Sequence, residues 1–212
     1  MQTASADKVI RILTVDDHHA LRDGIAAVVG AESDMVIAGE ASNGTEAIEA
    51  FERLRPDITL MDLQMPGLSG VDSITAIREG NPNARIIVLT AFHGDVPATR
   101  ALKAGACAYL LKTSFRSDLI DTIRTVHAGR RQIAPEIAQE IALHAGDEPL
   151  TRREMEILKL VASGQANKEI AWTLSVSEDT VKGNMKSIFG KLRVNDRAHA
   201  VATAFRRGAL HL

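Results

Sequence analysis

The sequence predicts an α/β domain with a doubly wound, five-stranded parallel sheet, followed by a small all-α domain. Up to about Gly129, five short apolar runs alternate with five amphipathic stretches of helical period, which is the pattern of consecutive β–α units. The apolar runs are nearly continuous, as in strands that helices cover on both faces of the sheet. From Leu150 onward the pattern is wholly helical, so a second domain without a sheet is expected there.

The expected elements of the first domain follow one another with short connections. We place strands near residues 10–15, 35–39, 57–61, 85–89 and 107–111, and helices near residues 19–31, 44–54, 70–79, 95–104 and 116–128. A short helix over residues 136–144 follows, because Pro135 suits the first position of a helix, where its missing N–H costs nothing. The polar stretch from Gly146 to Pro149 then ends it. The predicted domains are residues 8–129 and 148–212, joined by a linker of residues 130–147.

Four helices are expected in the second domain. Thr151 and Glu154 have the spacing of a capping box at the start of the first helix. The second helix covers residues 167–174, the third follows Ser177 as its N-cap, and the last covers residues 197–207.

The third of these helices has one apolar and one basic face. Its apolar side chains recur at helical spacing, at Val181, Met185, Ile188 and Leu192. Lys182, Gly183 and Lys186 then face away from the core, near the amino end of the helix. A short helix, a tight turn and a second helix with basic residues at its start are typical of a helix-turn-helix, which contacts phosphates or guanine edges in the major groove. The alternative is an ordinary solvated helix face.

The net charge of −2 conceals an asymmetry between the two domains. Residues 1–149 contain 14 Lys or Arg and 21 Asp or Glu, whereas residues 150–212 contain 11 and 6. The balances are therefore −7 and +5, which predicts different partners and a polyanion for the second domain.

The composition indicates in which compartment of the cell the protein is expected. The single cysteine, Cys107, excludes an internal disulfide framework and fits a reducing compartment. No apolar stretch approaches the roughly 18 residues of a membrane helix, and the first residues lack the apolar core of a signal peptide. We therefore expect a cytoplasmic protein with no membrane partner.

Polar side chains follow four of the predicted strands. These residues are Asp16 and Asp17, Asp62, Thr90 and Lys112. Because the carboxyl ends of parallel strands meet at one edge of the sheet, the side chains are expected to lie together. Such a set suits a hard divalent cation and a phosphoryl group, with Asp62 as the nucleophile. The alternative, that an Asp after a strand only forms a turn or caps a helix, explains one such residue better than it explains four strand ends.

These motifs resemble the receiver domain of bacterial two-component response regulators. The matching segments are Val15–His18, Met61–Gly67, Leu89–Ala91 and Gly105–Lys112, and the resemblance covers roughly residues 9–128. It implies a flavodoxin-like fold in which a histidine kinase phosphorylates Asp62.

The resemblance also implies a role for each residue of the site. Asp17, Asp62 and the backbone carbonyl of Gln64 would hold Mg²⁺ (or Mn²⁺), with Asp16 acting through a water. Lys112 and Thr90 would bind phosphoryl oxygens, and Thr90 and Tyr109 would form the switch, the ring of Tyr109 turning inward. Gln64 and Phe92 occupy positions that tune the lifetime of the phosphate.

One departure concerns the residue after Lys112. Receivers commonly have Pro there with a cis peptide bond, but this chain has Thr113. A non-proline cis bond costs about 3 kcal/mol. Either the loop enforces it or Lys112 is presented in another way.

The second domain closely resembles the LuxR-type helix-turn-helix, over essentially all of residues 148–210. The matching segments are Leu150–Glu154, Ala166–Ala171, Ser177–Lys182 and Lys191–Val194. With the receiver, this is similar to a NarL/FixJ-type transcriptional response regulator. The resemblance implies that Lys182 and Lys186 reach bases, that Thr180 and Lys168 contact phosphates, and that the last helix helps to pair two DNA-bound domains.

Two residues on the reading face depart from the family pattern. Asn184 stands where the family often has His, and Gly183 stands where a larger residue is common. A mid-helix Gly costs about 1 kcal/mol relative to Ala and leaves a gap on the face. Base preferences that differ from those of the best-known members are therefore expected.

The predicted function is a DNA-binding transcription regulator switched by phosphorylation of Asp62. Its expected partners are a histidine kinase, double-stranded DNA and, when phosphorylated, a second copy of the chain. It would catalyse its own phosphorylation and dephosphorylation without turning over a separate substrate. Two alternatives are a kinase-independent DNA-binding regulator whose receiver only dimerises, and a phosphotransferase with an aspartyl-phosphate. Against the second, Gln64 stands where haloacid dehalogenase-type phosphatases have an acid/base Asp.

Overall fold

The computed structural model describes residues 9–91 and 94–210. Phe92, one of the two positions expected to tune phosphate lifetime, lies outside the described residues. The chain divides into two compact units near residue 138, and each unit contains a hydrophobic core of its own.

A parallel sheet forms the centre of the first unit. Its strands have the order β2-β1-β3-β4-β5-β6. Their bounds are β1 Ile10–Val15, β2 Met35–Ala41, β3 Ile58–Met61, β4 Ile86–Thr90, β5 Ala108–Leu111 and β6 Gln132–Ile133. The five predicted strands are confirmed. The sixth has only two residues, which pair with Ala108 and Tyr109 of β5. It was not predicted, because a two-residue strand carries no periodic pattern, and its residues fell within the predicted linker.

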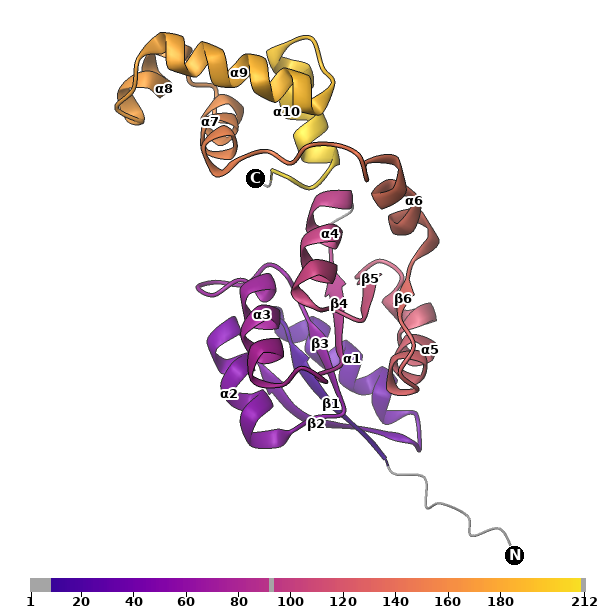
Figure 1. The fold of residues 1–212 in the computed structure, drawn as a ribbon. Coiled ribbons are helices and arrows are strands. Elements are labelled where there is room, and N and C mark those ends of the chain that lie inside the picture. The colour runs from indigo at the N-terminus through magenta and orange to yellow at the C-terminus, as the bar shows by residue number, and fades with distance from the viewer. Residues whose placement is uncertain (1–8, 92–93, 211–212) are drawn as a thin grey trace, which may run out of the picture. The chain divides into compact units, whose positions relative to one another are not determined.

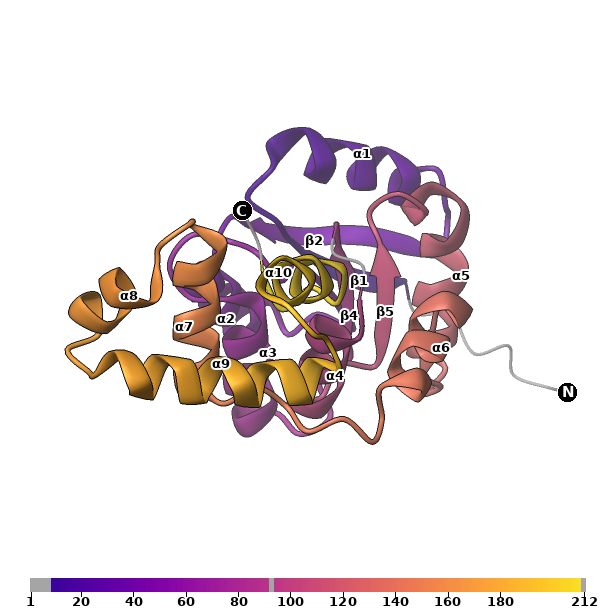
Figure 2. The ribbon, with the colours of Figure 1, turned by 90° about the horizontal axis from the view of Figure 1, so that it is seen from above.

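Helices cover both faces of this sheet (Figures 1 and 2). α1 (His19–Gly30) and α5 (Phe115–His127) lie on one face, and α2 (Gly44–Leu54), α3 (Gly70–Gly80) and α4 (Asp95–Ala104) lie on the other. A short helix, α6 (Pro135–Leu143), follows β6 and begins at Pro135 itself. The predicted doubly wound architecture is confirmed.

The strand register positions the side chains at the carboxyl edge of the sheet. Val15 of β1 pairs with Met61 of β3, so the residues that follow them, Asp16 and Asp62, leave the sheet side by side. Thr90 of β4 pairs with Leu111 of β5, which places Lys112 one residue beyond. All residues of β3, β4 and β5 are buried. Both faces of these three strands are therefore covered.

A buried hydroxyl in the sheet gives a first prediction about stability. Thr59 of β3 is fully buried, and its hydroxyl has no hydrogen-bond partner among the described residues. Burying an unpaired hydroxyl costs about 1–3 kcal/mol. We expect Thr59→Val, which keeps the shape, to raise the free energy of unfolding by about 1 kcal/mol. Urea denaturation followed by circular dichroism measures this, and an unchanged or lower value would show that the hydroxyl is satisfied.

The second unit contains a small helical domain. Its helices are α7 (Arg152–Ala162), α8 (Asn167–Thr173), α9 (Glu178–Leu192) and α10 (Arg197–Arg206). The predicted stripe on α9 is confirmed, because Val181, Met185, Ile188 and Leu192 are all buried. Both predicted N-termini are capped, α7 by the Thr151–Glu154 capping box and α9 by the Ser177 side chain, which accepts from the N–H of Thr180. In the described part of the chain, every helix is too short or too polar to cross a bilayer.

Candidate functional site

The carboxyl edge of the sheet carries a buried cluster of charges. Asp16 follows β1 and Asp62 follows β3, and their side chains are only 2% and 3% exposed. The Nζ atom of Lys112, from the end of β5, lies 2.7 Å from an oxygen of each carboxylate. Three strands thus bring together three of the predicted residues. The ammonium compensates two carboxylates that would otherwise be too costly to bury side by side.

Backbone donors hold the carboxylate of Asp62 in place. Its Oδ1 atom accepts from the N–H of Leu63 at 2.7 Å, and the backbone of Gln64 also hydrogen-bonds to the carboxylate. Burial raises the pKa of Asp62, and the charge of Asp16 adds to this, although the bonds to Lys112 act in the opposite direction. Burial by itself would lower the pKa of Lys112, but its hydrogen bonds to Asp16 and Asp62 outweigh this and raise it.

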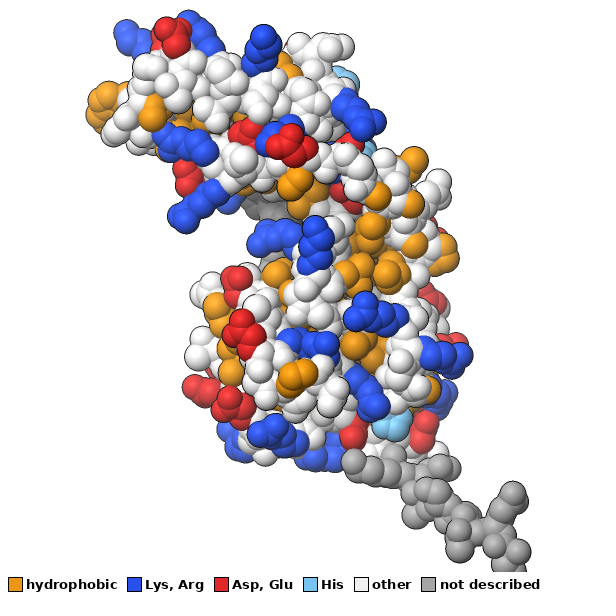
Figure 3. All heavy atoms as spheres, in the orientation of Figure 1, with side chains coloured by type: hydrophobic (Ala, Val, Ile, Leu, Met, Phe, Trp, Pro, Cys, Tyr) orange, Lys and Arg blue, Asp and Glu red, His pale blue; other side chains and the backbone are white. Residues whose placement is uncertain are grey.

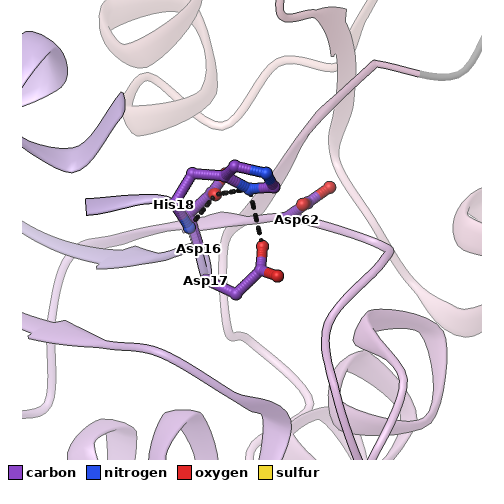
Figure 4. A group of neighbouring side chains, drawn as sticks. All are labelled: Asp16, Asp17, His18 and Asp62. Atoms are coloured by element: carbon purple, nitrogen blue, oxygen red, sulfur yellow. Dashed lines mark hydrogen bonds and ion pairs between the residues drawn. The ribbon is translucent and has the colours of Figure 1, made fainter. Parts of the chain in front are cut away.

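A metal ion fits the chemistry of the cluster. One oxygen each from Asp16, Asp17 and Asp62 and one ring nitrogen of His18 lie within 4.8 Å of one another (Figure 4). Carboxylate oxygens are the ligands that hard divalent cations prefer. Asp17 is the exposed carboxylate of the set, whereas Asp16 and Asp62 are buried.

Two residues whose contacts the sequence did not indicate, His18 and Arg22, hold the loop that contains Asp16 and Asp17. The N–H of His18 donates to Asp16 Oδ1 at 2.9 Å, and its Nδ1 lies 2.8 Å from Asp17 Oδ1, as the dashed lines in Figure 4 show. Arg22 of α1 donates from Nη1 to the carbonyl oxygen of Asp16 at 2.7 Å. His18 lies within one of the segments that match the receiver motifs, so the sequence indicated its place near the site. Nothing in the sequence predicted its contacts with Asp16 and Asp17. No signal in the sequence linked Arg22 to Asp16.

The residues of the predicted switch lie beside this cluster. Thr90, the last residue of β4, and Tyr109 of β5 are both fully buried. The backbone N–H of Lys112 donates to the carbonyl oxygen of Thr90 at 2.8 Å. Burial, together with the charge of Asp62, raises the pKa of the Tyr109 hydroxyl. All peptide bonds in the described residues are trans, so Lys112 reaches Asp16 and Asp62 without a cis bond to Thr113.

The second candidate site is the exposed face of α8 and α9. The predicted DNA-binding residues on this face are Lys168, Thr180, Lys182, Gly183 and Lys186, which are exposed, and Asn184, which is half-buried. In the space-filling view, several Lys and Arg side chains (blue) lie on the surface of the part of the second unit that contains α8 and α9 (Figure 3). A Cβ atom built on Gly183 would meet nothing within 4 Å. The predicted gap on the reading face is therefore open surface.

Several of these side chains already have partners on α9 itself. Lys182 lies 3.2 Å from Glu178 and 3.5 Å from Asp179, and these carboxylates raise its pKa. The Asn184 amide donates to the carbonyl oxygen of Thr180 at 2.8 Å. Exposed ion pairs contribute little to stability, so DNA can displace them at small cost. Lys186, in contrast, forms no ion pair with any of the described residues.

The site and the fold have counterparts in known proteins. The family model described as "Response regulator receiver domain" matches residues 12–124, and the one described as "Bacterial regulatory proteins, luxR family" matches residues 148–204. The response regulator protein VraR of Staphylococcus aureus is 38% identical over 206 residues, which cover 95% of this chain and 99% of that protein.

Two solved structures show similar folds. A two-component response regulator of the LuxR family from Aurantimonas sp. is 36% identical, with a TM-score of 0.62, and the match covers 65% of this chain and 99% of that one. RcsB from Salmonella enterica, solved bound to a promoter in the presence of phosphomimetic BeF₃⁻, is 25% identical. Its TM-score is 0.71, and the match covers 94% of this chain and 99% of that one.

The chain therefore belongs to the two-component response regulators that join a receiver domain to a LuxR-type DNA-binding domain. Receiver domains have a site for a divalent metal ion. Proteins of this family regulate transcription and do not turn over a separate substrate. The alternative of a phosphotransferase is thereby set aside.

Proposed function

We propose that this response regulator binds DNA under the control of a histidine kinase that phosphorylates Asp62. The observation that carries the proposal is the convergence of Asp16, Asp17, Asp62 and Lys112 at one edge of the sheet. The receiver occupies residues 8–129, a linker residues 130–147, and the DNA-binding domain residues 148–212.

The receiver takes the phosphoryl group onto Asp62. A carboxylate oxygen attacks the phosphorus of a phosphohistidine on the kinase, so that an O–P bond forms, the P–N bond breaks and the imidazole takes up a proton. The ammonium of Lys112 binds one phosphoryl oxygen, and the hydroxyl of Thr90 binds another. Attack by water on the same phosphorus later breaks its bond to the Asp62 oxygen, which releases inorganic phosphate and restores the carboxylate.

Mg²⁺ (or Mn²⁺) would be held by Asp17, Asp62 and the backbone carbonyl of Gln64, with Asp16 acting through a water. When bound, the ion offsets negative charge on the phosphoryl oxygens. The movement of Thr90 toward the phosphoryl group, with the ring of Tyr109 behind it, then biases the receiver surface toward its active state.

The active state pairs two copies of the chain on DNA. Helix-turn-helix readers usually bind two half-sites as dimers. Lys168, Thr180, Lys182, Gly183, Asn184 and Lys186 form the DNA-facing surface. The basic balance of residues 150–212 supports a polyanionic partner, as does the promoter complex of RcsB. The protein works in the cytoplasm without a membrane partner.

Sedimentation velocity on the full chain tests the proposed switch. Beryllofluoride with Mg²⁺ mimics the aspartyl-phosphate, and we expect it to shift the wild type from monomer to dimer. The isosteric Asp62→Asn variant, whose folding is checked by circular dichroism, is expected to show no shift. If Asp62→Asn responded like the wild type, Asp62 would not be the switch. If neither protein responded, the receiver would not gate dimerisation.

A further inference from the structure

A small pocket lies on the reading side of the DNA-binding domain. It has a volume of about 410 Å³ and is lined by Asn167, Lys182, Met185, Lys186, Phe189 and Arg197. These residues come from α8, α9 and the first residue of α10. The lining contains three cations and no carboxylate, so the pocket favours an anion.

Arg197 lies in the wall of this pocket and is hydrogen-bonded to three residues there. Its guanidinium donates to the carbonyl oxygens of Val161, at 3.3 Å, and Gln165, and to Asn167 Oδ1 at 3.5 Å. These bonds use three of the five N–H groups of a guanidinium. The remaining two, one on Nε and one on Nη1, have no partner among the described residues, so they can donate to an incoming anion from a side chain that is already partly ordered.

The two lysines of the pocket differ in their freedom. The ammonium of Lys182 is drawn toward the amino end of α9 by Glu178 and Asp179. Lys186 lies one turn further along the helix, is exposed, and has no ion pair with any described residue. Lys186 and Arg197 are therefore the two cations of the pocket whose N–H groups remain available to bind an anion.

The rest of the lining is one polar residue, Asn167, whose Oδ1 atom accepts from Arg197, and two apolar residues. Phe189 is half-buried and Met185 is buried, and both line the pocket. An edge of a base presents donors and acceptors in a plane, for which these two side chains offer no partner. A deoxyribose ring with its phosphate combines an apolar body with an anionic group, which matches an apolar floor beside two cations.

We infer that the pocket seats one sugar–phosphate unit of the DNA backbone, with the phosphate between Lys186 and Arg197 and the sugar against Phe189 and Met185. The inference rests on the proposed function and assigns Lys186 to the backbone, whereas the family resemblance implies a base contact. Lys186 then contributes affinity for any sequence, and base discrimination falls to residues nearer the start of α9, such as Lys182.

Fluorescence anisotropy with two DNA duplexes tests this assignment. One duplex is selected from a random library with the beryllofluoride-activated protein, and the other is a scramble of the same composition. We expect Lys186→Met to weaken binding to both duplexes by about tenfold, the usual loss for one charge-assisted hydrogen bond. The ratio of the two affinities should stay unchanged. The slope of log K against log [NaCl] should fall by about 0.9.

Control variants distinguish an effect at the pocket from the effect of removing any positive charge from the domain. Lys159→Met removes an exposed cation from α7, outside the pocket, and should leave the affinity and the salt slope almost unchanged. Arg197→Lys keeps the charge but loses the paired N–H groups of the guanidinium, so it should weaken binding to both duplexes equally. Because Arg197 also holds three partners within the domain, Lys186→Met is the decisive variant.

Two outcomes would overturn the inference. In the first, Lys186→Met brings the affinity ratio toward one while the scrambled duplex binds as before, so that Lys186 reads a base. In the second, Lys186→Met changes neither affinity nor slope, so that the pocket holds no phosphate. A selection in which the activated wild-type protein enriched no duplex would instead contradict the proposed function itself, which keeps the two failures distinguishable.

Discussion

Replacing Lys112 with methionine is expected to destabilise the metal-free receiver by about 3–5 kcal/mol, the usual cost of removing one partner from a buried ion pair. The side chain of Lys112 is 16% exposed, and the two carboxylates that it bridges are almost wholly buried. Without the ammonium, Asp16 and Asp62 repel each other in a site of low dielectric constant. The deficit is expected to shrink as pH falls, because protonated carboxyl groups need no counter-ion.

The same substitution is expected to strengthen Mg²⁺ binding, since the ammonium and the metal ion compete for the same carboxylates. Urea denaturation of the full chain at several Mg²⁺ concentrations measures both effects, because a ligand bound only by the folded state raises the free energy of unfolding with its concentration. Lys112→Arg keeps the charge and serves as the control. A Lys112→Met variant as stable as the wild type without metal would show that the carboxylates do not need the ammonium.

The receiver site could be predicted because chain direction and burial determine it. Each polar residue of the cluster ends an apolar run, and parallel strands bring such ends together regardless of the loops between them. Asp16, Asp62 and Lys112 therefore meet as predicted. The hydrogen bond from Arg22 to the carbonyl of Asp16 was not predictable in this way, because it depends on where α1 begins relative to the loop.

The DNA-binding face shows the same division between local and distant contacts. The buried stripe of α9 follows from helical spacing and was predicted correctly. The role of Arg197 depends on the carbonyl oxygens of Val161 and Gln165, more than thirty residues earlier in the chain. Periodicity and capping signals contain no information about such contacts, so Arg197 appeared only as the start of the last helix.

A buried acid in the DNA-binding domain gives the second large effect. Glu154 of α7 is 4% exposed. Its carboxylate accepts from Ser187 Oγ at 2.5 Å, from the N–H of Thr151 at 2.7 Å and from Lys191 Nζ at 2.9 Å. Ser187 and Lys191 belong to α9, so this carboxylate ties the proposed reading helix to α7. Burial acts to raise the pKa of Glu154, but the bonds from Ser187, Thr151 and Lys191 outweigh it and lower the pKa to about 2.

Glu154→Gln is therefore expected to lower the free energy of unfolding at pH 7 by about 3 kcal/mol, from about 1.4 kcal/mol for each unit of pKa shift. Because the folded pKa lies below the unfolded value, the stabilisation by Glu154 is fully present above about pH 4.5 and is lost as pH falls toward 2. The gap between wild type and variant should close over that range.

Hydrogen exchange measured by mass spectrometry can follow this loss in the full chain, through peptides from α7 and α9. Glu156→Gln is the matched control, because Glu156 lies on the same helix, is 41% exposed and pairs only with Arg152 and Arg153 among the described residues. An exposed pair of this kind contributes at most about 1 kcal/mol. If the two variants lost protection equally, or if the loss in Glu154→Gln did not depend on pH, the buried carboxylate would not be the link between α7 and α9. A selective loss would mean that the orientation of the proposed reading helix depends on one ionised side chain on the helix beside it.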